Sequence, residues 1–317
     1  MEDVDPIDDC QIVPLPGKQF QFLLGGNEVT RWHASHDVPG PYFYPIQGKH
    51  GVGLTRMGHP GAPNHDHHRS FWFAHNDLLG IDFWSEETSA RIRQSQWLAI
   101  EDGDSHARLA VELFWQDGHD PTPILKQTVF FTLRRGEQNK QVLWTLELQS
   151  EFQAQGEGVE FRQSNFGILG LRVAKSLSVV FGSGKILGAD GNTGERQLFG
   201  QPNRWIDYSG PVGRVNGKPM VEGLALIDHR SNPGHEPAAW AAWHIRDDGW
   251  IGPSLSRHGP VSVPTKDTLC CRYLLAVHEG DAPTADLNRL ADRFDASKRL
   301  RLVERPKPHH QWAITDS

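Results

Sequence analysis

The sequence predicts an all-β protein, folded as one large antiparallel β-sandwich with a single helix near the C-terminus. Three observations favour this fold class. Alternating apolar and polar residues recur along the chain, as in strands with one buried face. The 317 residues include 32 Gly, 21 Pro and 11 Trp, which is typical of many short strands joined by turns. Only one stretch has helical spacing. A dozen or more strands must stack, because open twisted sheets rarely exceed about ten strands.

The first segment, 1–18, is acidic and punctuated by prolines, and we expect an arm or a first edge strand there. Five later segments alternate with period two and are bounded by turn-forming residues, so each predicts a strand with one apolar face. These faces are Leu109, Val111, Leu113 and Trp115; Val129, Phe131 and Leu133; Val142, Trp144, Leu146 and Leu148; Leu177, Val179 and Phe181; and Leu269, Cys271, Tyr273, Leu275 and Val277.

The segment 284–297 predicts the one helix. Thr284 is a plausible N-cap, and one face of the helix carries Leu287, Leu290, Ala291 and Phe294. We expect this helix to lie on the outside of a sheet, followed by a tail over 306–317. No repeat or long linker divides the chain, so the sequence predicts a single domain over 1–317.

Composition excludes several classes of protein. The net charge of −7 offers no basic surface for nucleic acid, and no apolar run reaches the roughly 20 residues of a membrane-spanning helix. The acidic N-terminus lacks the pattern of a secretory signal, which indicates a cytoplasmic protein. The three cysteines, Cys10, Cys270 and Cys271, do not form a disulfide framework, and reduced thiols fit best.

The residues 59–84 are the richest in functional groups. Five of the 17 histidines lie there: His59, His65, His67, His68 and His75. Arg69, Trp72, Asp77, Asp82 and Trp84 accompany them. Histidine exchanges protons near neutral pH and is the commonest metal ligand, so this density predicts a polar binding site. The alternative is a solvated loop, or histidines that are hydrogen-bonded in the core.

The first part of this stretch, 59–68, is rich in Gly, Pro and Asn and predicts a loop, whereas 69–75 has strand character. Strict alternation places His68 and His75 on opposite faces of that strand. We expect a β-bulge or the loop end at residue 68 to bring the two imidazoles together.

Two kinds of chemistry fit these residues. In acid–base catalysis, histidines transfer protons while Arg69 neutralises oxygen charge. In metal binding, the candidates are His59, His67, His75 and Asp77, and a distal ligand could come from His229, His244, His258 or His278. We expect no cofactor, although a divalent metal remains an alternative.

Three further polar groups lie later in the chain. One, at 160–172, contains Glu160, Arg162, Gln163, Asn165 and Arg172. The second, at 190–210, combines groups suited to sugar hydroxyls and to the apolar faces of pyranose rings, namely Glu195, Arg204, Trp205, Asp207 and Tyr208. A buried Arg204–Asp207 strut would give the same pattern. In the third, His244 shares a strand face with Trp240, Ala242 and Arg246; it could line a site or simply bond a carbonyl group.

Several segments, in order, resemble the bacterial PmoA family of unknown function: HHRSFWFAHNDLLGIDFW, FGILGLRVA, GNTGE, RWIDYSG, LALIDHRSNP, WHIRDDG and RYLLAVHEG. The resemblance covers roughly residues 40–280. The chain departs from the family pattern at residues 74–77, where a Gly-His-Gly-Asp turn is expected, and at 163–165, where small glycines are usual. The family's label of methane oxygenase does not fit, because a membrane copper enzyme requires spanning helices that this sequence lacks.

The resemblance implies a galactose-mutarotase-like supersandwich that binds or transforms a sugar on a concave sheet. On this basis we expect histidine-led chemistry at a ring carbon: mutarotation or epimerisation first, elimination or hydrolysis second. His68 and His75 would be the acid–base pair, Arg69 and Arg162 would stabilise oxygen charge, and His244 would assist. The expected substrate-binding residues are Trp72, Asp77, Trp84, Arg162, Arg204, Trp205 and Asp207.

The expected partner is therefore a sugar or oligosaccharide, with no nucleic acid and no membrane. Two alternatives remain open at the level of sequence: a non-catalytic sugar-binding protein and a metal-dependent enzyme.

Overall fold

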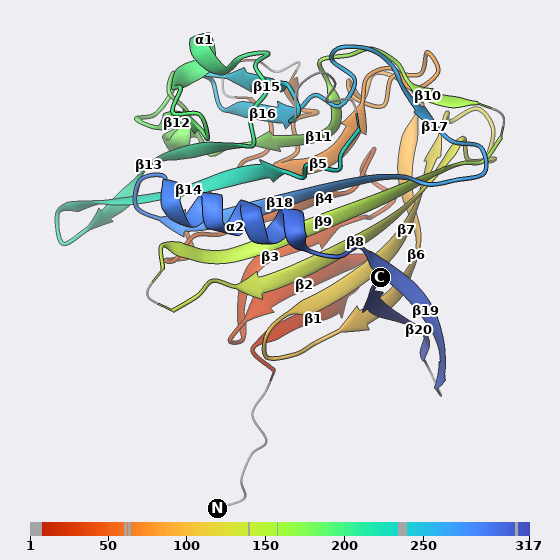
Figure 1. Ribbon diagram of the computed structural model, residues 1–317, viewed down its shortest axis with the longest axis horizontal. Helices are drawn as coiled ribbons and strands as arrows, with labels where there is room; N and C mark the ends of the chain where they lie inside the picture. Colours follow the sequence, from red (N-terminus) through yellow and green to blue (C-terminus); the bar gives the residue numbers. More distant parts are fainter. Residues whose placement is uncertain are drawn as a thin grey trace, which may run out of the picture.

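Two eight-stranded antiparallel sheets form the body of the protein in a computed structural model (Figure 1), which describes residues 8–59, 62, 65–138, 140–156, 158–233, 240–307 and 310–317. The first sheet contains, in spatial order, β1 (Cys10–Leu15), β2 (Gln19–Leu24), β3 (Asn27–His33), β4 (Tyr42–Ile46), β5 (Phe71–His75), β11 (Gly167–Arg172), β16 (Trp250–Pro253) and β15 (Trp243–Arg246). The second contains β12 (Lys185–Gly188), β13 (Trp205–Val215), β14 (Lys218–Asp228), β18 (Leu269–Glu279), β9 (Val142–Ala154), β8 (Leu125–Arg135), β7 (Ala107–Gln116) and β6 (Arg91–Glu101).

Shorter elements complete the fold. Two further strand pairs are β10 (Val159–Phe161) with β17 (Val261–Val263), and β19 (Leu300–Lys307) with β20 (His310–Asp316). The helices are α1 (Gly194–Leu198) and α2 (Thr284–Ala296), and a 3-10 turn, η2, covers Lys175–Leu177. No helix among the described residues has the length and hydropathy needed to cross a membrane.

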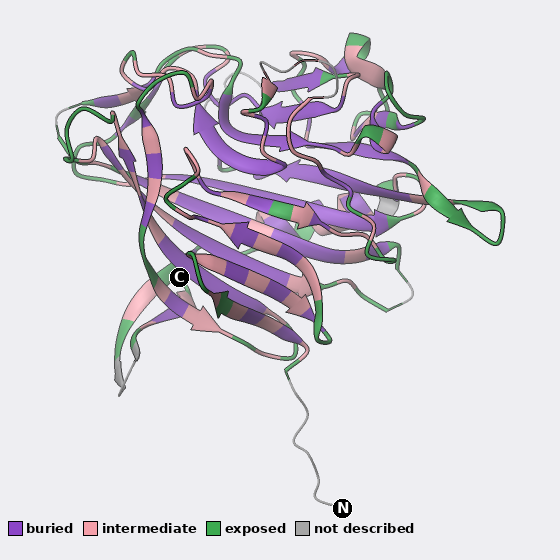
Figure 2. Ribbon diagram, turned by 180° about the vertical axis from the view of Figure 1, so that it is seen from behind, coloured by how far each residue is buried: buried purple, intermediate pink, exposed green. Residues whose placement is uncertain are grey.

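One apolar core lies between the two sheets and takes side chains from both. The faces predicted for β7, β8, β9 and β18 point into it, except that Val142 at the start of β9 packs in the cluster beneath α2. At its centre Trp32 of the first sheet contacts Phe131 of the second, with ring centroids 4.8 Å apart. Figure 2 shows the alternation directly, as buried residues interleaved with less buried ones along several strands. The predicted antiparallel sandwich is therefore confirmed.

The helix α2 covers the outer face of the second sheet, as predicted (Figure 1). Its residues Leu287, Ala291 and Phe294 pack against Trp205 and Leu274 of that sheet. The N-cap differs from the prediction: Pro283 occupies that position and Thr284 is the first helical residue, with no side-chain cap bond. The apolar stripe, rather than a capping hydroxyl, holds this helix in place.

The C-terminal segment 306–317 is not the predicted tail. Its described residues 310–316 form β20, which pairs with β19, and Leu300 and Ile314 of this hairpin pack on Ala99 and Phe130 of the second sheet. At the other end, β1 is an edge strand paired with β2, within the segment 1–18; residues 1–7 lie outside the described residues.

The strand predicted over 177–181 is also wrong. Leu177 ends the turn η2, and Val179 and Phe181 are 39% and 37% exposed. The backbone N–H groups of residues 179 and 180 both donate to the carbonyl oxygen of Asp247, so this backbone forms a turn instead of a strand ladder.

Candidate functional site

The candidate site lies on the outer face of the first sheet, over β5, β11, β16 and β15. Alternation along β5 puts Phe71 and Phe73 in the core and leaves Trp72 and Ala74 on the outer face. There Trp72 packs with Trp84 and Trp250 in a second, smaller apolar cluster. An aromatic surface is thus built on the side of the sheet that faces away from the core.

A cavity of about 460 Å³ borders this cluster, and we call it the histidine–tryptophan pocket. It is lined by four imidazoles, three aromatic rings and three charged groups: His65, His67, His68 and His244; Trp84, Phe166 and Trp250; and Glu87, Arg246 and Asp248. The loop before β5, the β5–β6 connection, the segment before β11 and the β15–β16 hairpin all contribute. Segments far apart in the sequence therefore meet here.

The rings in this pocket are in direct contact. The centroids of His67 and His68 lie 4.6 Å apart, and His65 and His68 lie 5.1 Å apart. His244 meets the indole of Trp250 edge to face, with centroids 4.3 Å apart. His68 stands 6.3 Å from the same indole. Trp250 is thus flanked by two imidazoles, His68 and His244, that lie far apart in the sequence.

The loop that carries these histidines is anchored close to β5. Gly58 donates its backbone N–H to the carbonyl oxygen of His68, at 2.8 Å. Ser70 adopts a left-handed φ of +59° and donates its hydroxyl hydrogen to Thr55 Oγ1, at 2.7 Å. A non-glycine residue in this conformation is uncommon and is held by its surroundings. These contacts fix His68 on the same side of the strand as Trp72, with ring centroids 5.6 Å apart.

The buried imidazoles are neutral near pH 7. Burial lowers the pKa of His68 to about 2, and the neighbouring His67 and Arg172 contribute in the same direction. Burial likewise lowers the pKa of His244 to about 4, with smaller contributions from Arg246 and Arg257. Both side chains can therefore donate one hydrogen bond and accept another.

The carboxylate of the pocket, Asp248, stays ionised. Burial by itself would raise the pKa of Asp248, but the Arg172 guanidinium lowers it overall. Arg172 is fully buried and donates from Nη1 to Asp248 Oδ1 at 2.7 Å, while His59 Nε2 lies 3.1 Å from Oδ2. Arg246, at the rim, pairs with Glu195 at 3.3 Å. The pocket thus combines one oriented carboxylate with neutral imidazoles.

Four ring nitrogens around the pocket have no hydrogen-bond partner among the described residues. They are His68 Nδ1, Trp72 Nε1, His244 Nδ1 and Trp250 Nε1. These four side chains are only 7%, 4%, 7% and 3% exposed, respectively. A buried polar atom without a partner costs roughly 1–3 kcal/mol, and native proteins contain few of them. Unpartnered buried atoms also occur elsewhere in the described residues, but three of these four side chains, His68, His244 and Trp250, line the same cavity, which makes it the candidate binding site.

The predicted acid–base pair of His68 and His75 is not brought together. His75 points to the core side of β5, where its ring lies 5.0 Å from that of Phe161. Its Nε2 donates to the carbonyl oxygen of Arg162 at 3.2 Å, and burial lowers the pKa of His75 to about 4. The expected bulge is absent from β5, so the period-two rule keeps the two imidazoles on opposite faces.

Arg69, Asp77 and Arg162 also lie outside the pocket lining. Arg69 donates to both carboxylate oxygens of Glu86, at 2.5 and 2.7 Å. Asp77 Oδ1 accepts the backbone N–H of Gly80 at 2.7 Å and lies 3.7 Å from the half-exposed Arg162. Arg69 is committed to an ion pair, and Asp77 shapes a turn.

The predicted sugar-binding residues Arg204, Trp205 and Asp207 lie at the start of β13 in the other sheet, away from the pocket. Arg204 pairs with Asp292 and Asp295 of the helix, each at 2.7 Å. Trp205 donates from Nε1 to Asn288 Oδ1 at 2.8 Å. Asp207 accepts from His278 Nε2 at 2.6 Å, and both side chains are fully buried. The prediction that these residues converge with the histidines is therefore wrong. Arg204 forms its ion pairs with α2, and Asp207 is bonded to His278 instead of to Arg204.

The predicted metal ligands do not form one group. Among the described residues, no cluster of three or more His, Cys, Asp or Glu side chains has the geometry for a metal ion. His59 and His67 belong to the ring cluster of His65, whereas His75 and Asp77 lie elsewhere. The proposed distal ligands are also dispersed: His244 lines the pocket, His258 is exposed, His229 accepts from Arg272, and His278 pairs with Asp207.

Sequence reasoning correctly placed His68, His244, Trp72 and Trp84 on one surface, but it missed Trp250. A signal was present in the segment 243–253. Gly249 has a φ of +101°, as required for a tight turn, and the resulting hairpin pairs Arg246 with Trp250. Treating this segment as a hairpin would have placed Trp250 near the face of His244.

Comparisons with known proteins identify the family but not its activity. Residues 19–292 match the Family of unknown function (DUF6807), and the chain belongs to this family. None of the comparisons supports the PmoA name. No curated protein sequence matches the chain. Among solved structures, the chain is similar to a Salmonella typhimurium protein proposed to be a mutarotase (YeaD), with 12% identity and a TM-score of 0.36; the match covers 87% of this chain and 92% of the other.

Proposed function

We propose that the histidine–tryptophan pocket binds a sugar, and that its imidazoles catalyse proton transfer at a ring carbon, with mutarotation or epimerisation as the first reaction to test and elimination or hydrolysis as the second. The observation that carries this proposal is the set of unpartnered ring nitrogens beside the cavity. Among the lining residues these are the indole N–H of Trp250 and one imidazole nitrogen each of His68 and His244, which suit a ligand that both accepts and donates hydrogen bonds.

A pyranose meets that requirement. Its hydroxyl groups donate and accept, and the apolar face of its ring packs on aromatic side chains. Trp84, Phe166 and Trp250 supply such a surface, and Asp248 and Glu87 supply carboxylate acceptors. The cavity volume of about 460 Å³ lies within the range of small-molecule sites, which is roughly 300–1,000 Å³.

The proposed roles follow from the charge states. Neutral His68 would donate a hydrogen bond to a sugar oxygen, and neutral His244 would act as the base, since its pKa of about 4 is the higher of the two values. Asp248, oriented by Arg172, would bind a hydroxyl group. Each proton-transfer group typically contributes 10²–10⁴-fold to the rate. The proposal uses only the protein's own side chains.

The test combines binding and turnover measurements. Saturation-transfer NMR with a panel of aldoses, including glucose, galactose and mannose, would detect binding. Polarimetry and NMR exchange would measure mutarotation. His244→Gln should reduce turnover by about 100-fold or more while binding persists, and His68→Gln should weaken both. The matched control is His258→Gln, an exposed histidine outside the pocket. Absence of sugar binding by the wild type would overturn the proposal.

A non-catalytic sugar-binding protein is the second candidate. Its support is the same pair of low pKa values, because an imidazole with a pKa of about 2 or 4 is a weak proton acceptor at neutral pH. Sugar binding that is lost on Trp250→Ala, without any acceleration of mutarotation, epimerisation, elimination or hydrolysis, would establish this candidate.

We also propose a reducing, cytoplasmic setting. All three cysteines are buried and free, including the adjacent Cys270 and Cys271. This fits a compartment where thiols stay reduced. Fractionation of cells that produce the native protein would test the location.

A further inference from the structure

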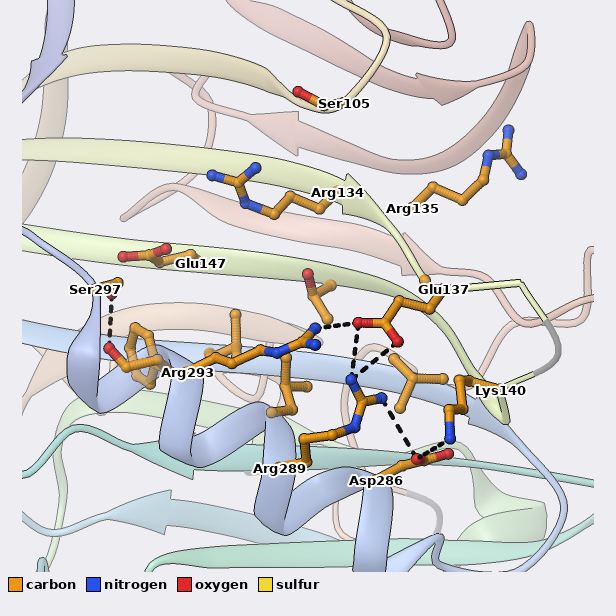
Figure 3. A pocket seen from close by; sticks show the side chains of 16 residues that line it. Ser105, Arg134, Arg135, Glu137, Lys140, Glu147, Asp286, Arg289, Arg293 and Ser297 are labelled. Atoms are coloured by element: carbon orange, nitrogen blue, oxygen red, sulfur yellow. Dashed lines mark hydrogen bonds and ion pairs between the residues drawn. The ribbon is translucent and has the colours of Figure 1, made fainter.

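A second cavity, of about 330 Å³, lies on the opposite side of the sandwich, between α2 and the adjoining ends of β8 and β9 (Figure 3). We call it the Arg134 cleft. Five cations but only three carboxylates line it; the carboxylates are Glu137, Glu147 and Asp286. The cleft is therefore rich in positive charge, although the whole chain is acidic.

The carboxylates on the helix side are already occupied. Glu137 accepts from both Arg289 and Arg293, as Figure 3 shows. Asp286 lies 3.5 Å from Lys140 Nζ and 3.4 Å from Arg289 Nη2. These five side chains form one closed network along the edge of the cleft, so none of its carboxylates is left over for another cation.

The remaining carboxylate has a different partner. Glu147 Oε1 accepts from Arg272 Nη2 at 2.5 Å, and the same guanidinium donates to Ser297 Oγ and to the Ser297 carbonyl oxygen. Arg135, at the rim, pairs with Asp9. Among the described residues, Arg134 alone of the five lining cations forms neither an ion pair nor a side-chain hydrogen bond.

Arg134 is also half-buried, so its charge is only partly hydrated. Burial lowers the pKa of Arg134, and the distant attraction of Glu147 offsets this effect only in part. A buried guanidinium is ordinarily paired, because desolvation without a partner is costly. A bound anion would therefore supply the partner that this half-buried side chain lacks.

The positive charge of Arg134 also affects the pKa of a neighbouring histidine, His106. Burial lowers the pKa of His106 to about 4, and the next two causes are the positive charges of Arg108 and Arg134. Arg108 has its own partner, Asp316. The positive charge of Arg134 thus extends to His106, which follows the lining residue Ser105 in the chain.

The other wall of the cleft is apolar. It is lined by Val142 and Leu274 from the sheet and by Leu290 and Phe294 from α2, and the hydroxyl of Thr145 lies among these side chains.

We propose that the Arg134 cleft binds a small molecule that carries an oxyanion, either a phosphate or a carboxylate. The oxyanion pairs with Arg134, while an apolar portion of the molecule rests between the sheet and α2. The planar guanidinium can make two parallel hydrogen bonds to either group.

The test uses four probes at matched ionic strength: inorganic phosphate, acetate, phenyl phosphate and benzoate. Binding to the full-length protein is measured by isothermal calorimetry. We expect phenyl phosphate or benzoate to bind more tightly than the matching simple anion, because only the aromatic probes reach the apolar wall. Preference between the phosphate and carboxylate pairs identifies the oxyanion.

Two substitutions at Arg134 and one elsewhere complete the experiment. Arg134→Gln should weaken binding by about tenfold or more. Arg134→Lys keeps the positive charge but loses the planar guanidinium with its two parallel N–H donors, so its affinity should be intermediate. Arg301→Gln, an exposed arginine of β19, removes the same charge outside the cleft and should leave the affinity unchanged. Equal binding by wild type and both Arg134 variants, or no binding of any probe by wild type, would overturn the proposal.

Discussion

The outer faces of the two sheets both carry tryptophan and histidine side chains, but these side chains differ in their hydrogen-bond partners. In the second sheet, Trp205 donates to Asn288 of α2 and Asp207 accepts from His278, although Asp207 Oδ1 and His278 Nδ1 have no partner among the described residues. On the other sheet, the indole nitrogens of Trp72 and Trp250 have none among the described residues, and one ring nitrogen in each of His68 and His244 is also unpartnered. On the second sheet, hydrogen bonds and ion pairs fasten α2 to the strands, whereas the outer face of the first sheet borders the histidine–tryptophan pocket.

This contrast shows that residue type does not distinguish a strut from a site. A polar group that stabilises the fold has its partner inside the protein, because an unpaired buried group costs free energy. A polar group kept for a ligand lacks that partner and persists only where function compensates for the lost stability.

The largest effect on stability is expected from His278→Ala. This change leaves the fully buried carboxylate of Asp207 without its hydrogen-bond partner, so the free energy of unfolding should fall by about 3–5 kcal/mol. Urea denaturation would measure it. Sugar binding by the folded fraction should be unchanged, since the pair lies in the other sheet. A loss below about 1 kcal/mol would show that the pair is not a structural joint.

The matched change on the site face is His68→Leu. Removing an imidazole with an unpartnered nitrogen from aromatic surroundings should leave the free energy of unfolding unchanged or raise it by up to about 2 kcal/mol. The same variant should bind sugar at least about tenfold more weakly in calorimetric titrations. If His68→Leu were destabilised as strongly as His278→Ala, His68 would be a structural residue like His278.

The pH dependence of stability sharpens the comparison. His68 has a pKa of about 2 in the folded protein and near 6.5 in an unfolded chain. The unfolded state therefore binds more protons below pH 6.5, so this contribution to stability is complete above about pH 6.5 and declines as the pH falls towards 2. Between pH 5.5 and 4, wild type should lose up to about 1.4 kcal/mol per pH unit more than His68→Leu. Parallel unfolding curves for the two proteins would contradict a depressed pKa.

The smallest effect is expected from Arg204→Gln on the helix side. Arg204 bridges to Asp295, which is mostly buried, and to Asp292, whose side chain is 71% exposed. Exposed ion pairs contribute little, so the loss should be about 1 kcal/mol in thermal unfolding, with no change in sugar affinity. A large loss of sugar affinity would revive the prediction that Arg204 binds substrate.

Much of the fold could be read from the sequence, because alternation is a local property of a strand. The apolar faces of β7, β8, β9 and β18, and the stripe of α2, depend only on residue spacing. The errors arose where backbone hydrogen bonds decided the outcome. The segment 177–181 alternates, yet its N–H groups are taken by Asp247. The segment 306–317 looks polar and irregular, yet β20 finds β19 as its partner.

The candidate site, too, was only partly predictable from the sequence. Sequence alone determined that Trp72 and His75 face opposite sides of β5, since side chains alternate along any strand. His68 precedes β5, and the tertiary contacts of Gly58 and Ser70 set its position beside Trp72. Only the tertiary structure decided that β5 pairs with β11 and β11 with β16, which brings Trp250 and His244 to the early histidines and leaves Asp207 in the other sheet. The physical reason is that alternation is set by neighbouring residues, whereas the order of strands in a sheet is set by pairing between segments distant in the chain.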